Sequence, residues 1–155
     1  MKVLIIYSSS YKGNTEKIAK IFSEKADCDL VNIKDKKQLA LEKYDLIGFG
    51  SGVYKESVSS GLIRVIETLE LQGKPVFVFS TSGVGIKAYN RSLIRVLASK
   101  GARVRGSFAC KGSFVAEEFT AVRIFALLSR LAEGHPGRKD FRTAEKFILD
   151  VVGSL

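Results

Sequence analysis

Short apolar runs alternate with amphipathic segments along the whole chain. The runs are rich in β-branched and aromatic residues and carry little polar alternation, a pattern typical of strands that are buried on both faces of a sheet. We therefore predict five strands. They cover residues 2–7, 30–33, 44–51, 76–80 and 103–110.

The segments between these runs place apolar residues three and four positions apart, which predicts helices with one buried face. The predicted helices cover residues 14–24, 60–71, 90–100, 119–132 and 140–152, with a weaker helix at 35–43. Alternation of strands and helices predicts an α/β fold with a doubly wound five-stranded parallel sheet. The length of 155 residues fits a single domain over residues 1–155, with 111–138 as an insert before the last helix.

Composition excludes several classes of protein. No apolar run approaches the roughly 20 residues that span a bilayer, and we expect a cytoplasmic protein. Cys28 and Cys110 are the only cysteines, which predicts two reduced thiols. The single histidine, His135, lies in a Gly-His-Pro-Gly segment typical of a turn. Because a zinc site usually needs four ligands and a serine triad needs a well-placed histidine, we expect neither a metal site nor a catalytic triad.

Charge is distributed unevenly along the chain, whose net charge is +9. Residues 1–77 carry 12 Lys and Arg against 10 Asp and Glu, whereas residues 78–155 carry 13 against 6. A basic half favours an acidic protein, an anionic membrane surface or nucleic acid as partner; the alternative is a solvated surface that only aids solubility. No groove-reading motif and no aromatic-basic platform occurs, so we expect no specific nucleic-acid binding.

Three small polar loops follow predicted strands. In open α/β sheets, ligands bind beyond the carboxyl ends of the strands, so these loops are candidate site residues. The first runs from a buried strand directly into a helix and offers hydroxyl groups, a glycine and free helix N–H groups, which together suit a phosphate. An ordinary turn with a helix cap is the alternative. Its candidate residues are Ser8, Ser9, Ser10, Lys12, Gly13, Asn14 and Thr15.

The second and third loops suit a flat ring. Gly52, Val53 and Tyr54 follow the third strand and combine a close backbone approach with apolar and aromatic surface. The alternative is that the glycines near this strand end, at 48, 50 and 52, serve packing and that the tyrosine is merely exposed. The third loop is suited to hydrogen bonding a heteroaromatic edge, with a plain loop as the alternative. Its candidate residues are Thr81, Ser82, Gly83 and Gly85.

These loops, in this order and spacing, resemble those of the flavodoxin-like FMN-binding proteins over essentially the full chain. The residues that carry the resemblance are 2–19, 44–54, 74–85, 108–112 and 134–148, which include NTEKIA, GFGSGVY, FSTSG and GHP. The resemblance implies a parallel sheet in the order 2-1-3-4-5 with FMN at the point where the strand order reverses.

The resemblance also implies roles for residues. It places the phosphate at Ser8, Ser10, Lys12, Gly13, Asn14 and Thr15, and the ring at Gly52, Val53, Tyr54, Thr81, Ser82 and Gly83. The first loop is one residue longer than the common family pattern, which leaves open which of Ser8, Ser9 and Ser10 points inward. Lys12 stands where that pattern is neutral. The chain has no Trp, so Tyr54 is the candidate for the outer stack, with Tyr11 and Tyr89 as alternatives.

By this resemblance the chain is expected to be a low-potential electron-transfer flavoprotein that needs no side chain as acid or base. One alternative is a flavin-dependent oxidoreductase, linked to quinones or similar to the protoporphyrinogen oxidases; another is a non-catalytic basic binding module. The family resemblance implies an acidic surface, whereas this chain is basic, so we expect an acidic redox partner protein. For the apolar segment 119–132 one hypothesis is contact with an anionic membrane or with a quinone. The alternative is a helix that packs in the core or contacts a second copy in a homodimer.

Overall fold

Five parallel strands form the central sheet of the computed structural model, which describes residues 1–9, 13–112 and 134–155. Their spatial order is β2-β1-β3-β5-β6, and a short sixth strand, β4, pairs antiparallel with β3. Counted along the parallel strands, this is the predicted order 2-1-3-4-5. The strands are β1 (Val3–Ser8), β2 (Cys28–Asn32), β3 (Leu46–Tyr54), β4 (Ser57–Val58), β5 (Pro75–Ser82) and β6 (Arg103–Lys111).

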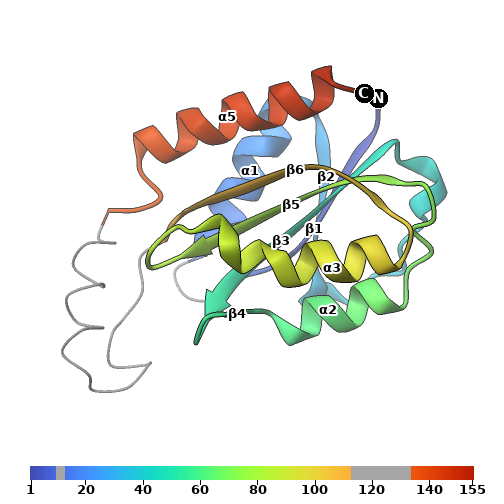
Figure 1. Ribbon diagram of the computed structural model, residues 1–155. Coiled ribbons are helices and arrows are strands. Elements are labelled where there is room, and N and C mark those ends of the chain that lie inside the picture. The colour runs from blue at the N-terminus through green and yellow to red at the C-terminus, as the bar shows by residue number, and fades with distance from the viewer. Residues whose placement is uncertain (10–12, 113–133) are drawn as a thin grey trace.

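Helices cover both faces of this sheet, as Figure 1 shows. On one face lie α1 (Asn14–Ala26) and α5 (Arg138–Gly153), which pack against each other. On the other face lie α2 (Ser60–Glu67) and α3 (Arg91–Ser99), the latter preceded by a 3-10 turn, η3 (Lys87–Asn90). No helix in the described part of the chain is long and apolar enough to cross a membrane.

The core is divided by the sheet into two halves, because successive side chains of a strand point to opposite faces. In β1, Val3 and Ile5 pack with α1 and α5, whereas Leu4 and Ile6 pack with α2 and α3. All four side chains are buried, which explains why the sequence of this strand shows no polar alternation.

Two glycines of β3 allow aromatic rings of β5 to lie against the neighbouring backbone. Gly48 is paired with Phe77, and Gly50 with Phe79. A Cβ added at Gly48 or Gly50 would lie 2.3 or 2.0 Å from the Cζ atom of the paired ring. Gly48 and Gly50 therefore serve packing, which was the alternative interpretation of these glycines.

The weak helix predicted at 35–43 is wrong. Two 3-10 turns, η1 (Ile33–Asp35) and η2 (Leu41–Lys43), stand there with irregular chain between them. Lys36 ends η1 in the left-handed region, at φ 47°, and so interrupts any longer helix. The ammonium group of Lys74 then donates to the carbonyls of Leu41 and Tyr44, which anchors this segment without an α-helix.

The helix predicted at 60–71 is shorter than expected. It ends at Glu67, and the hydroxyl of the next residue, Thr68, donates to the carbonyl of Val65.

The hairpin from β3 to β4 was not predicted from the sequence. Its turn has positive φ at Lys55 and Glu56 but contains no glycine that would have indicated it. The helix predicted at 119–132, and most of the insert, lie outside the described residues.

Candidate functional site

The three candidate loops leave the sheet side by side. Strands β1, β3 and β5 are neighbours, and their carboxyl ends are level, with Ser8 paired with Ser51 and Ser51 with Ser80. Parallel strands end at the same edge of a sheet, so the loops that follow them meet there. The structure thus brings together the loops that the sequence singled out.

In the first loop, Gly13 begins α1 in the left-handed conformation, at φ 64°, and contributes no capping side chain. The hydroxyl of Ser9 instead accepts a hydrogen bond from the N–H of Glu16, at 3.3 Å. Ser9 is therefore occupied with capping the helix. Asn14 and Thr15 are buried in its first turn, and Ser8 is the half-buried end of β1. Ser10 and Lys12 lie outside the described residues.

A buried hydrogen bond joins the first loop to the third. The hydroxyls of Thr15 and Thr81 lie 2.8 Å apart, and both side chains are buried. Either hydroxyl can donate. This contact holds the start of α1 against the end of β5, so it fixes the spacing between the two loops.

Thr15→Val in the FMN-free protein is expected to cost about 1–3 kcal/mol of unfolding free energy, because it leaves the Thr81 hydroxyl buried without its partner. Thr81→Val is expected to cost a similar amount. The double variant should cost much less than the two together, since no polar group is then stranded. Urea unfolding measures all three. Additive losses would contradict a direct bond between these hydroxyls.

The second loop is anchored by Ser51. Its hydroxyl donates to the carbonyl of Gly52, at 2.6 Å, and accepts from the N–H of Ser59, at 2.8 Å. Gly52 pairs with Thr81 within the sheet and does not have a positive φ. The Tyr54 side chain folds back over it, so that a Cβ at Gly52 would lie 3.1 Å from the phenol oxygen. Val53 and Tyr54 are half-buried beside the hairpin to β4.

The third loop is held from within and from β6. The Ser82 hydroxyl accepts from the N–H of Gly85, at 2.7 Å, and the Ser82 carbonyl accepts from the N–H of Gly112, at 2.9 Å. Gly85 has a φ of 67°, and a Cβ there would lie 2.9 Å from the backbone nitrogen of Lys111. Position 85 thus requires glycine because its φ is positive and because the backbone of Lys111 lies too close for a side chain. The sequence alone did not reveal this role. Gly83 is half-buried between these anchors.

Gly85→Ala is expected to destabilise the protein by about 2–3 kcal/mol, because a left-handed alanine is strained and its methyl group meets rigid backbone. Gly73→Ala is the matched control. Gly73 also has a positive φ, 73°, but nothing lies within 4 Å of its would-be Cβ, so the expected cost is only about 1 kcal/mol. Thermal or urea unfolding compares the two; equal losses would refute the backbone contact.

Comparison with known proteins assigns the family. The chain matches the model of the flavodoxin domain over residues 4–121. This chain belongs to the flavodoxin domain family. An uncharacterised protein of Methanocaldococcus jannaschii is 34% identical over 154 residues, covering 98% of this chain and 99% of the relative.

Solved structures have the same fold. A flavodoxin from the domain Archaea superposes with a TM-score of 0.67 at 16% identity, covering 99% of this chain and 98% of its own. A Streptococcus pneumoniae flavodoxin superposes with a TM-score of 0.65 at 17% identity, and the superposition covers 100% of both chains. A Lactobacillus acidophilus flavoprotein in complex with FMN gives 0.56 at 25% identity, covering 68% of this chain and 91% of its own.

The chemistry of this flavodoxin domain's loops suits a phosphorylated, flat ligand. None of the residues 8–15, 48–54 and 80–85 is acidic, so no fixed negative charge within these loops repels a phosphate. The start of α1 presents N–H groups and a positive dipole end at the same edge. The Ser80 hydroxyl, within the last three residues of β5, is buried and has no hydrogen-bond partner among the described residues. These features fit FMN.

The two cysteines of this flavodoxin domain are buried and free. Burial, with a smaller contribution from Asp140, raises the pKa of the Cys110 thiol. Burial also raises the pKa of Cys28, to about 12, with Asp27 and Asp29 adding to the effect. Both thiols are therefore protonated at neutral pH, and neither is suited to act as a nucleophile there.

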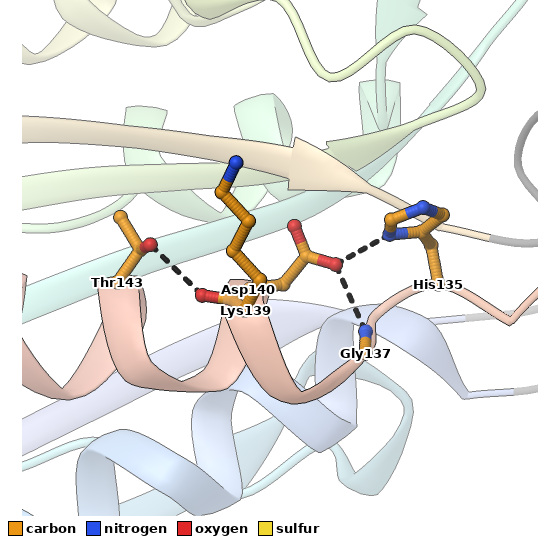
Figure 2. Close-up of polar contacts among 5 residues, drawn as sticks. All are labelled: His135, Gly137, Lys139, Asp140 and Thr143. Carbon is orange, nitrogen blue, oxygen red and sulfur yellow. Dashed lines mark hydrogen bonds and ion pairs between the residues drawn. The ribbon is translucent and has the colours of Figure 1, made fainter.

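His135 belongs to the turn that begins α5, as predicted. Figure 2 shows the carboxylate of Asp140 between two partners. One Asp140 oxygen accepts from the N–H of Gly137, at 2.9 Å, and lies 2.5 Å from Nδ1 of His135. Asp140 thereby caps its own helix and fixes the imidazole. Asp140 was not among the residues predicted from the sequence, although an acidic residue three positions after the start of a helical pattern is a usual sign of such a cap.

Proposed function

We propose that this protein binds FMN and transfers electrons between protein partners. The observation that carries the proposal is the meeting of three acid-free, hydroxyl- and glycine-rich loops at the carboxyl edge of a flavodoxin-domain sheet, joined by the Thr15–Thr81 contact. The similarity to a flavoprotein solved in complex with FMN supports this choice of cofactor.

In this proposal, the start of α1 binds the phosphate. Gly13 turns the chain so that the N–H groups of the first helical turn face the ligand, and the side chains of Asn14 and Thr15 are buried beside it. Ser9 keeps the helix start rigid by accepting the N–H of Glu16. Ser8 supplies a further donor, whereas Ser10 and Lys12, the other candidates for this role, lie outside the described residues.

The other two loops hold the ring. Gly52, Val53 and Tyr54 form one wall, in which the tyrosine supplies the aromatic surface. Thr81, Ser82 and Gly83 form the other, and Gly85 fixes that loop on β6. The apolar side chain of Val53 and the aromatic ring of Tyr54 lower the polarity beside the flavin ring and so disfavour added negative charge there.

FMN supplies the redox chemistry when it is bound. The three loops contain no histidine, cysteine or carboxylic acid that could move a proton. This composition favours electron transfer over an enzymatic reaction that needs an acid or a base.

The test is an anaerobic titration of the FMN-loaded protein with dithionite, followed by its visible spectrum. An electron carrier should show a stable one-electron-reduced form and a midpoint potential below that of free FMN. It should also be reduced only slowly by NADH or NADPH. Direct two-electron reduction, with rapid bleaching by either nucleotide, would favour a flavin oxidoreductase instead.

A further inference from the structure

The edge of the sheet beyond the third loop is strongly basic. From Leu71 to Ala116 the chain contains no Asp or Glu, but it contains eight Lys and Arg residues. The described part of this stretch forms β5, η3, α3 and β6, and β6 is the last strand of the sheet. One continuous unit of the fold therefore carries positive charge only.

Three of the eight cations are used within the fold. Lys74 donates to carbonyls of the segment at 41–44, Lys100 to the carbonyl of Glu67, and Arg103 to the carbonyl of Gly73. The other five have neither an ion-pair nor a hydrogen-bond partner among the residues that the structure describes. They are Lys87, Arg91, Arg95, Arg105 and Lys111.

Three of these cations form a stripe that works against helix stability. Lys87, Arg91 and Arg95 follow one another at intervals of four residues along η3 and α3, and all three are exposed. Like charges at this spacing repel each other, and cations at a helix N-terminus oppose its dipole. In α1, by contrast, Glu16 stands in the first turn and pairs with Lys20 at 3.0 Å.

The stripe begins beside the proposed flavin site. Ile86, which directly follows the third loop, is 48% exposed although it is a large apolar residue. Gly85 lies against the backbone of Lys111, which brings the end of β6 to the same place. The turn at Lys55 and Glu56 lies next to this region, because β4 contacts η3. The charges of Lys55 and Glu56 cancel, so the turn adds no net charge to the region. An exposed apolar residue is thus bordered by cations.

We propose that Ile86 and the cations Lys87, Arg91, Arg95, Arg105 and Lys111, here termed the cationic face, dock an acidic electron-transfer protein. The proposal rests on the proposed function, because a partner on this face would sit next to the flavin loops. Negative charge on the partner would relieve the repulsion along the stripe and steer the encounter, while Ile86 would provide an apolar contact.

A protein fits the cationic face better than a membrane does. A helix that lies on a bilayer presents a broad apolar face to the lipid. The apolar residues Leu93 and Leu97 of α3 are instead fully buried against the sheet, so only its polar side is available. Ile86 is the single large apolar residue of the cationic face that is exposed.

The test uses the FMN-loaded, isotope-labelled protein and an acidic plant-type 2Fe–2S ferredoxin as probe. Amide NMR shifts map the contact, and calorimetry gives the affinity at low and high salt. The test variant is Lys87→Gln/Arg91→Gln/Arg95→Gln, which removes repulsion and so leaves the fold intact. The control, Lys34→Gln/Lys37→Gln/Lys43→Gln, removes the same charge near β2, the opposite edge of the sheet.

The expected result is that shifts gather at 85–95 and 105–111 and that affinity falls with salt. The test variant should bind about tenfold more weakly, and the control within about twofold of the parent. Shifts elsewhere, equal weakening of both variants, or no binding would overturn the proposal. So would preference for phosphatidylserine vesicles or single-stranded DNA over ferredoxin. Flavin absorbance is read in the same samples, so failure of docking is distinguished from failure of FMN binding.

Discussion

Gly50→Ala is expected to lower the free energy of unfolding by at least about 3 kcal/mol, because no space exists for the new methyl group. A Cβ at this position would lie 2.0, 2.4 and 2.5 Å from three ring carbons of Phe79. That ring is fully buried and touches the ring of Phe22, so it has no free direction in which to move. Urea unfolding of the variant and the parent measures the loss.

The companion variant is Phe79→Leu, which replaces the obstructing ring with a smaller side chain. Alone it should cost about 1–2 kcal/mol through the cavity that it leaves. Combined with Gly50→Ala it should recover part of the loss, because the methyl group then fills space that the ring vacated. Losses that simply add would show that the glycine is needed for some other reason.

Phe22→Ala is expected to cost about 3–5 kcal/mol, the range for a large aromatic side chain removed from a core. Phe22 is fully buried at the centre of an aromatic cluster, with Phe77, Phe79, Phe108 and Phe147 at ring-centroid distances of 5.0–5.9 Å. It joins α1 to three surfaces at once, the two strands β5 and β6 and the helix α5. Chemical unfolding measures the loss.

Phe147→Ala is the matched control for Phe22→Ala. Phe147 of α5 belongs to the same cluster but is only partly buried, whereas Phe22 is fully buried. Its removal should cost about 2 kcal/mol, since less surface is returned to water and solvent can enter the gap. An equal loss for the two variants would contradict the central position of Phe22 in the core.

The architecture was predictable because the three central strands β1, β3 and β5 are buried on both faces. Runs such as 2–7 and 76–80 contain almost no polar residue, and the structure shows strands at Val3–Ser8 and Pro75–Ser82. The helix predicted at 35–43 was wrong because the helix propensity of this segment is weak. Its conformation depends instead on hydrogen bonds from Lys74, a residue that is distant in sequence. The hairpin turn at Lys55 and Glu56 lacks the glycine that would have marked it.

The site was predictable in its place but not in the function of each residue. The three loops could be predicted to lie at one edge of the sheet, because each follows the carboxyl end of a parallel strand. Which glycine serves packing depends on the residue opposite it, as in the pairs Gly48 with Phe77 and Gly50 with Phe79, and this register does not follow from the sequence alone. Likewise, the capping contact of Ser9 and the backbone contact of Gly85 arise only once the chain has folded.

The central claim is that these three loops bind FMN, with the phosphate at the start of α1. The most direct measurement is a fluorescence titration of the FMN-free protein with FMN and, in parallel, with riboflavin, which lacks the phosphate. We predict one FMN per chain and an affinity for riboflavin that is lower by about 100-fold, because the helix N–H groups lose a charged acceptor. No uptake of FMN, or equal affinity for the two flavins, would contradict the account.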